Sequence, residues 1–152
     1  MRHSSNGFAV LFAAFAFAHV SAAQEPERAE VLSRDGATKL VLFDRQIVFQ
    51  FTEQGARDAS AGVAPKTNKK NWNWMDDVLQ GSASGIQDMK MVFKLEDVRD
   101  ARYDDDTLTL YMSSRPVDAP AADRRGLFRY DDVPQDQSKA FVREFRRLKG
   151  SA

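Results

Sequence analysis

The chain has 152 residues and contains no cysteine. No disulfide can therefore hold the fold together, and its stability must come from a hydrophobic core. The two histidines, His3 and His19, both lie close to the N-terminus. Without that segment the chain has neither imidazole nor thiol. This excludes Ser-His-Asp and Cys-His catalytic sites, zinc sites built from Cys and His, iron–sulfur clusters, and haem ligated by either residue. The sequence predicts no cofactor.

Residues 1–23 have the order of a secretory signal peptide. Arg2 opens a short polar stretch, residues 8–20 are almost all apolar, and residues 21–23 are the small residues that a signal peptidase requires. The apolar run is too short to span a bilayer comfortably. We therefore expect the signal peptide to be removed and the mature protein to be exported, either to the periplasm or out of the cell.

Size and charge fit one domain. The 152 residues less the 23 of the signal segment leave 129, a usual size for a single domain. Arg2 is the one basic residue in that segment, which holds no acid, so 21 basic and 22 acidic residues remain, a net charge of −1. This near-neutral balance argues against a nucleic-acid binder, whose affinity rests on a strong basic field. No second long apolar run occurs, so the mature chain is predicted to have no transmembrane segment.

Two blocks of β-type sequence predict antiparallel strands. In the first block, residues 40–43 and 47–51 are separated by a short polar break that begins with Asp44 and Arg45 and ends at Gln46, which predicts a hairpin. Residues 47, 49 and 51 then share one face, because side chains alternate along a strand.

The second block begins with alternating apolar residues over 89–95. Residues 98–103 and 107–112 then read as a hairpin with residues 104–106 at its turn, and residues 127–130 read as a last short strand.

An amphipathic helix is predicted to close the chain. Asp132 can cap it, Pro134 suits its first turn, and Gly150 ends it. Its apolar stripe, at spacings of i, i+4 and i+7, consists of Phe141, Phe145 and Leu148. The cations near its end, which favour the negative pole of the helix dipole, are Arg143, Arg146, Arg147 and Lys149.

These elements predict an α+β fold, in which antiparallel strands form a small roll or partly open barrel closed by one C-terminal amphipathic helix. Residues 24–37 are expected to be a polar leader with one short element at 29–33. Residues 38–150 then form a single domain. Within it, residues 53–71 have almost no large apolar side chain and are predicted to be a polar insert in loop form.

One part of the chain resembles a known family. Residues 95–103, LEDVRDARY, with residues 107–110, TLTL, look like the central strands of bacterial pleckstrin-homology-like domains. The closing helix with residues 140–142 and Leu148 is similar to theirs, so the resemblance covers about residues 89–149. It implies a PH-like fold and a tendency to bind partners, and it does not fix a function.

Three consecutive acids, Asp104, Asp105 and Asp106, are candidates for a calcium site in an exported protein. Calcium loops space their oxygen ligands and use a glycine for the bend, so a solvated turn is the favoured interpretation and no metal is predicted. Carboxylates also leave one enzymatic class open, because a hydrolase needs only two acids across a cleft. None of the acids lies within an apolar run that would raise its pKa.

A second candidate site lies around two tryptophans. Trp72 and Trp74 would share one face of an extended segment, and Lys69 and Lys70 come just before them. Such a surface could stack on sugar rings or contact an anionic surface. The alternative is that both rings pack on the domain while the lysines solvate a loop, and packing is the commoner outcome for aromatic residues.

The sequence therefore predicts an exported, non-enzymatic binding or interaction module. Its partner is expected to be a protein, a glycan or an envelope component, which the sequence does not identify, and nucleic acid is not expected. The alternative is a small periplasmic hydrolase that uses pairs of Asp and Glu as acid and base. The two differ in one observable: a hydrolase needs a pocket with converging acids, whereas a module presents an apolar or basic patch.

Overall fold

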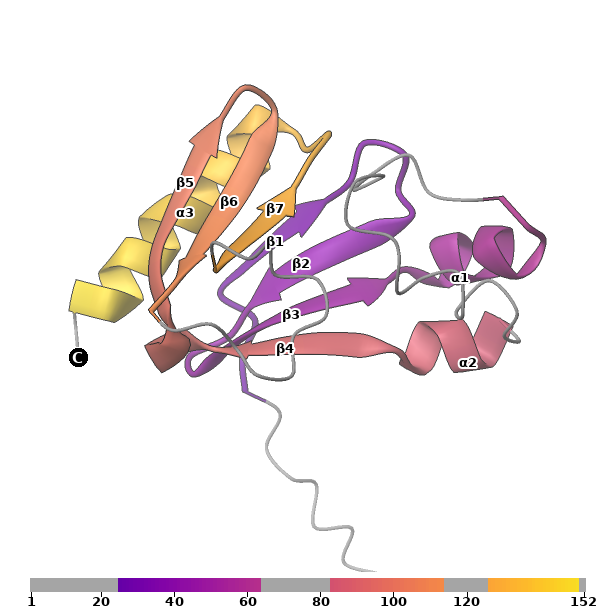
Figure 1. The fold of residues 1–152 in the computed structure, drawn as a ribbon, viewed down its shortest axis with the longest axis horizontal. Helices are drawn as coiled ribbons and strands as arrows, with labels where there is room; N and C mark the ends of the chain where they lie inside the picture. Colours follow the sequence, from indigo (N-terminus) through magenta and orange to yellow (C-terminus); the bar gives the residue numbers. More distant parts are fainter. Residues whose placement is uncertain (1–24, 64–82, 114–125, 151–152) are drawn as a thin grey trace, which may run out of the picture.

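The computed structural model describes residues 25–63, 83–113 and 126–150 of the protein (Figure 1). The predicted signal peptide and the candidate residues Lys69, Lys70, Trp72 and Trp74 lie outside these ranges.

Within the described ranges, seven strands form two antiparallel sheets. In the first sheet the order is β1-β2-β3-β4, and in the second it is β5-β6-β7. The strands of the first sheet are β1 (Ala29–Leu32), β2 (Thr38–Leu42), β3 (Gln46–Phe51) and β4 (Lys90–Lys94). Those of the second are β5 (Val98–Asp104), β6 (Thr107–Met112) and β7 (Leu127–Tyr130). A short 3-10 turn, η2 (Leu95–Asp97), leads from β4 directly into β5.

The predicted hairpins are confirmed. Strands β2 and β3 pair with Leu40 opposite Phe49, and β5 and β6 pair with Ala101 opposite Leu110. In both hairpins the apolar residues of the period-two pattern are buried, because they face the space between the sheets.

Aromatic rings join the two sheets. Phe49 of the first sheet lies 5.5 Å from Phe128 and 5.5 Å from Tyr130 of the second, both in edge-to-face contact. The rings of Phe93 and Phe128 are 4.9 Å apart. These contacts place the core between the sheets, where edge-to-face pairs add to the stabilisation that burial provides.

Helix α3 (Gln135–Gly150) closes the core. It contacts β1 of the first sheet and β5 of the second, so it covers the open side between them (Figure 1). Phe141 and Phe145 are buried, and the partly buried Leu148 packs against the same core. The predicted α+β class and the closing helix are confirmed. The strands form two separate sheets and do not close into a barrel.

The prediction of a loop over residues 53–71 is wrong for its first part, which forms helix α1 (Glu53–Ser60). Thr52 caps this helix, since its Oγ1 accepts a hydrogen bond of 3.0 Å from the N–H of Gly55. The helix buries small residues, Gly55, Ala56 and Ala59, and therefore lacks the large apolar stripe that a sequence pattern reveals.

The short element predicted at 29–33 is confirmed as strand β1. Because it pairs with β2 along its whole length, this part of the predicted leader belongs to the first sheet. Helix α2 (Ala83–Asp88), which the sequence analysis did not predict, lies beside α1 and buries Ile86 (Figure 1).

Asp132 does not cap α3. It lies three residues before the first helical residue and has a φ of 56°, outside the extended conformation of an N-cap residue. Its carboxylate lies 3.6 Å from the guanidinium of Arg34, so it forms an ion pair between the segment before α3 and the segment after β1.

Candidate functional site

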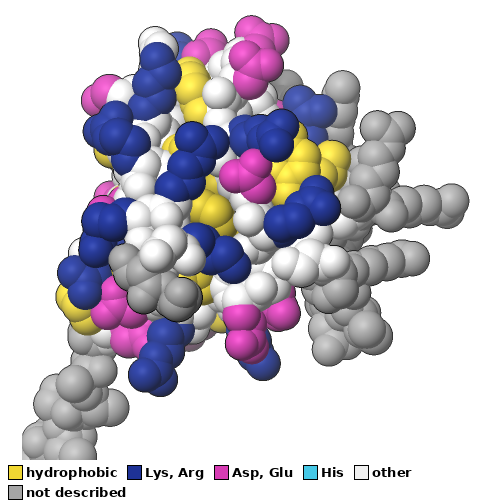
Figure 2. Space-filling model, turned by 90° about the vertical axis from the view of Figure 1, so that its left-hand side faces the viewer, with side chains coloured by type: hydrophobic (Ala, Val, Ile, Leu, Met, Phe, Trp, Pro, Cys, Tyr) yellow, Lys and Arg dark blue, Asp and Glu magenta, His cyan; other side chains and the backbone are white. Residues whose placement is uncertain are grey.

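A groove runs between α3 and β5. It has a volume of about 400 Å³. Its lining residues are Arg102, Tyr103, Lys139, Val142, Arg143 and Arg146. Figure 2 views the molecule from the side on which α3 and β5 lie in Figure 1, and Lys and Arg side chains are spread over this face, with acidic side chains mainly toward its edges.

Three of the lining cations come from one side of α3. Lys139, Arg143 and Arg146 follow at i, i+4 and i+7, which places them in one row along the helix. All three are exposed, whereas Phe141 and Phe145 on the core side are buried. In the part of the chain that the structure describes, no ion pair involves any of the three. Their charge is therefore available to a ligand.

The fourth cation, Arg102, is partly neutralised. Its Nε lies 2.8 Å from Oδ2 of Asp100, and its guanidinium carbon is 5.1 Å from the centre of the Tyr111 ring. The hydrogen bond from Arg102 holds the pKa of Asp100 below its usual range, against the effect of burial, and the charge of Arg146 lowers it slightly further. Arg102 is thus held in place on the strand side of the groove.

The apolar part of the groove comes from Val142 and Tyr103. Val142 is 8% exposed and belongs to the core. The hydroxyl of Tyr103 donates a hydrogen bond of 3.0 Å to the carboxylate of Asp106, at the far end of the hairpin. Burial raises the pKa of Tyr103, and the hydrogen bond to Asp106 adds to this effect. The groove is therefore basic along its rim, with an apolar floor.

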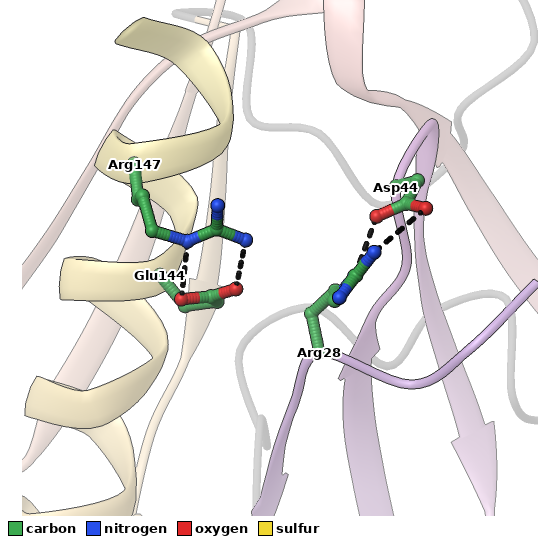
Figure 3. A network of polar contacts seen from close by, with 4 residues as sticks. All are labelled: Arg28, Asp44, Glu144 and Arg147. Atoms are coloured by element: carbon green, nitrogen blue, oxygen red, sulfur yellow. Dashed lines mark hydrogen bonds and ion pairs between the residues drawn. The ribbon is translucent and has the colours of Figure 1, made fainter. Parts of the chain in front are cut away.

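The other flank of the exposed face of α3 has a different charge pattern (Figure 3). There Arg147 binds Glu144 through two hydrogen bonds of 2.9 and 2.6 Å. Beside this pair, Arg28 binds Asp44 through two hydrogen bonds of 2.6 and 3.1 Å. The two arginines on this flank are thus matched by acids, whereas Lys139, Arg143 and Arg146 on the groove side are not.

The triple aspartate is placed in a turn. Asp105 and Asp106 have φ values of 46° and 55°, as the two central residues of a type I′ hairpin turn require. The carboxylate of Asp106 also accepts a hydrogen bond of 2.8 Å from Arg34. Among the described residues, no group of three or more Asp, Glu, His or Cys could hold a metal ion.

A second hollow, of about 430 Å³, lies where the first sheet meets α1 and α2. Its charged lining residues are Lys39, Lys90, Glu30, Glu53 and Asp88. Lys39 and Glu30 already form an ion pair of 3.0 Å. Because this hollow has both signs of charge, it selects a ligand by charge less strongly than the groove between α3 and β5 does.

This groove was not predicted from the sequence, in which Arg143 and Arg146 are assigned to the helix dipole and are not connected with Lys139. The spacing of these three residues, at i, i+4 and i+7 opposite the apolar stripe, was the available signal. Arg102 could not be added to it, because nothing in the sequence places β5 beside α3.

Comparison with protein-family models, curated proteins and solved structures finds no match to this chain. No helix among the described residues is both long enough and apolar enough to cross a membrane.

Proposed function

We propose that this protein is an exported, non-enzymatic binding module of PH-like type, and that the groove between α3 and β5 binds an anionic group of its partner. The observation that carries the proposal is the row of exposed, unpaired cations along one side of α3, set over an apolar floor. Charge of one sign in a concave site concentrates ligands of the opposite sign. Two sheets closed by one C-terminal helix support the PH-like assignment.

The pKa values of the acids favour a binding module over a hydrolase. Three described carboxyl groups have a clearly shifted pKa, and in each an arginine lowers it: Asp44, Asp100 and Glu144. A general acid at neutral pH needs a raised pKa. Among the described residues that line the groove, none has a carboxylate that could act as base or nucleophile.

Titration with inorganic tripolyphosphate, a small polyanion, tests the groove. The dissociation constant is measured by calorimetry for the unmodified protein and for the triple variant Lys139→Gln, Arg143→Gln, Arg146→Gln. We expect the triple variant to bind about tenfold more weakly or worse, since three charge contacts are lost. The matched control is Arg45→Gln, Lys90→Gln, Lys94→Gln, which removes the same charge from exposed positions on the first sheet.

Equal weakening of both triple variants would show that only net charge matters, and the groove would then not be the site. A selective loss in the α3 variant supports the proposal. Export is tested separately by N-terminal sequencing of the protein recovered outside the cytoplasm. The sequence should begin near residue 24, and a product that begins at Met1 would contradict the proposed export.

A further inference from the structure

We propose that the ligand of this groove is an extended acidic peptide segment with acids at alternating positions, recognised by its side chains. This inference rests on the proposed function, since it concerns the same groove. It adds the chemical class and the shape of the ligand.

The shape follows from the arrangement of the cations on α3. At a rise of 1.5 Å per residue, Lys139 and Arg146 are separated by about 10 Å along the helix axis, with Arg143 between them at about 6 Å from Lys139. The three charges therefore lie in a line and do not converge on one point. A single phosphate or carboxylate can contact only part of such a row. In an extended peptide, side chains on one side repeat about every 6.7 Å, which long Lys and Arg side chains can match.

The apolar floor fits the same ligand. Val142 lies within the row, between Lys139 and Arg143 in sequence, and Tyr103 forms the facing wall. The methylene groups of Glu side chains can pack on this floor while their carboxylates reach the cations. Nucleic acid fits less well, because single strands bind through exposed stacking rings, whereas the Tyr103 ring is half-buried and its hydroxyl is held by Asp106. The net charge of the protein also provides no strong basic field.

Strand β5 is poorly suited to pair with an added peptide strand, so the peptide is recognised through its side chains. This strand carries an irregularity between Val98 and Asp100, where its pairing with β6 shifts. The N–H of Ala101 donates a hydrogen bond of 2.9 Å to the carboxylate of Asp100. This group is therefore not available to an added strand.

The test compares ligands of equal charge and different spacing. The first probe is the capped peptide Gly-Glu-Gly-Glu-Gly-Glu-Gly, and the second is Gly-Gly-Glu-Glu-Glu-Gly-Gly, which has the same composition with its acids adjacent. Inorganic tripolyphosphate is the third. We expect the alternating peptide to bind at least threefold more tightly than the peptide with adjacent acids. Equal affinities of the two peptides would overturn the inference.

The variants at the two ends of the row give a second readout. Lys139→Gln and Arg146→Gln should each weaken binding of the alternating peptide about threefold or more. Neither should change the affinity of a peptide with a single Glu by more than a small factor, because one acid needs only one of the three cations. The control variant Lys94→Gln, on the first sheet, should leave both affinities unchanged. All three positions are exposed, and unchanged melting temperatures verify that each variant folds.

The outcomes separate this inference from the proposed function. If tripolyphosphate binds through α3 and neither peptide does, the groove binds anions and the peptide inference fails. If none of the probes binds, both fail. Tighter binding of a single-stranded oligonucleotide or an oligogalacturonate than of the alternating peptide would assign the groove to another class of polyanion.

Discussion

The hydroxyl of Tyr130 on β7 donates a hydrogen bond of 2.8 Å to the backbone carbonyl of Thr38 on β2, across the interior of the protein. The same oxygen lies 3.1 Å from Oγ1 of Thr38, and both side chains are fully buried. This contact is a polar connection between two sheets that otherwise meet through apolar rings.

Replacing Tyr130 by Phe should therefore destabilise the protein although it keeps the ring. The substitution removes this buried hydrogen bond, which costs about 0.5–1.5 kcal/mol, while the Thr38 carbonyl still accepts a hydrogen bond of 3.0 Å from the N–H of Ser33. The free energy of unfolding is measured by urea denaturation. Tyr111→Phe, at a half-buried position on β6, is the control and should change it by less than about 0.5 kcal/mol. Equal effects of the two variants would contradict the assigned role of the buried hydroxyl.

The buried hydroxyl of Tyr130 should also affect how the free energy of unfolding depends on pH in the alkaline range. Burial raises the pKa of Tyr130 well above its ordinary value, so the folded protein keeps the proton that the unfolded chain loses. Stability from this group is fully present below the unfolded tyrosine pKa of about 10 and is lost as the pH rises beyond it. Unfolding free energies between pH 8 and 11 should decline more steeply for the unmodified protein than for Tyr130→Phe. Parallel declines would refute this assignment.

Helix α3 should contribute to stability through its apolar stripe. Phe145→Ala removes a ring that is 1% exposed, which costs about 3–5 kcal/mol. Arg143→Ala, on the exposed side of the helix, should cost less than about 0.5 kcal/mol. Urea midpoints of the two variants provide the comparison, and coincident midpoints would mean that α3 is not docked through Phe145.

Gly55 in α1 should not tolerate alanine. A Cβ at this position would overlap the backbone carbonyl oxygen of Ala37, which cannot move without displacing the start of β2. In an unobstructed helix the same change stabilises by about 1 kcal/mol, so the sign of the effect is diagnostic. We expect Gly55→Ala to destabilise by about 1–3 kcal/mol, as overpacking does. Thermal unfolding measures it, with the exposed Arg57→Ala as the control in the same helix.

Removing the acid at the edge of the groove should strengthen anion binding. Asp100→Asn frees Arg102 from its ion pair and removes a negative charge near Arg146. We expect tripolyphosphate to bind about two- to threefold more tightly at neutral pH, in line with the modest strength of exposed pairs. Calorimetry gives the dissociation constants. Asp105→Asn, in the hairpin turn, makes the same change in net charge and should have a smaller effect.

The elements that could be predicted from the sequence are those in which large apolar residues recur with a fixed period. Phe49 and Leu110 belong to runs in which every second residue is large and apolar, and both are buried in paired strands. Helix α1 was not predicted because its buried face consists of Gly55, Ala56 and Ala59, whose small side chains give no strong hydrophobic pattern. For such a helix, the close approach of the backbone takes the place of large apolar contacts.

The candidate site could be predicted only in part, for a different reason. The row of Lys139, Arg143 and Arg146 is a local property of one helix and can be read from spacing. Its pairing with Arg102 depends on the contact between α3 and β5, which are distant in sequence. The candidate ligand-binding residues chosen from the sequence, Trp72 and Trp74 with Lys69 and Lys70, lie outside the described residues, so that hypothesis stays a prediction.

One consequence follows from the double role of α3. The same helix buries Phe141 and Phe145 and carries the cations of the groove. A helix of this length is marginal alone in water, so the row of charges exists in its bound geometry only while the helix is docked. Ligand binding and global unfolding are therefore linked equilibria: saturating ligand must raise the melting temperature, and partial undocking of the helix must release the ligand.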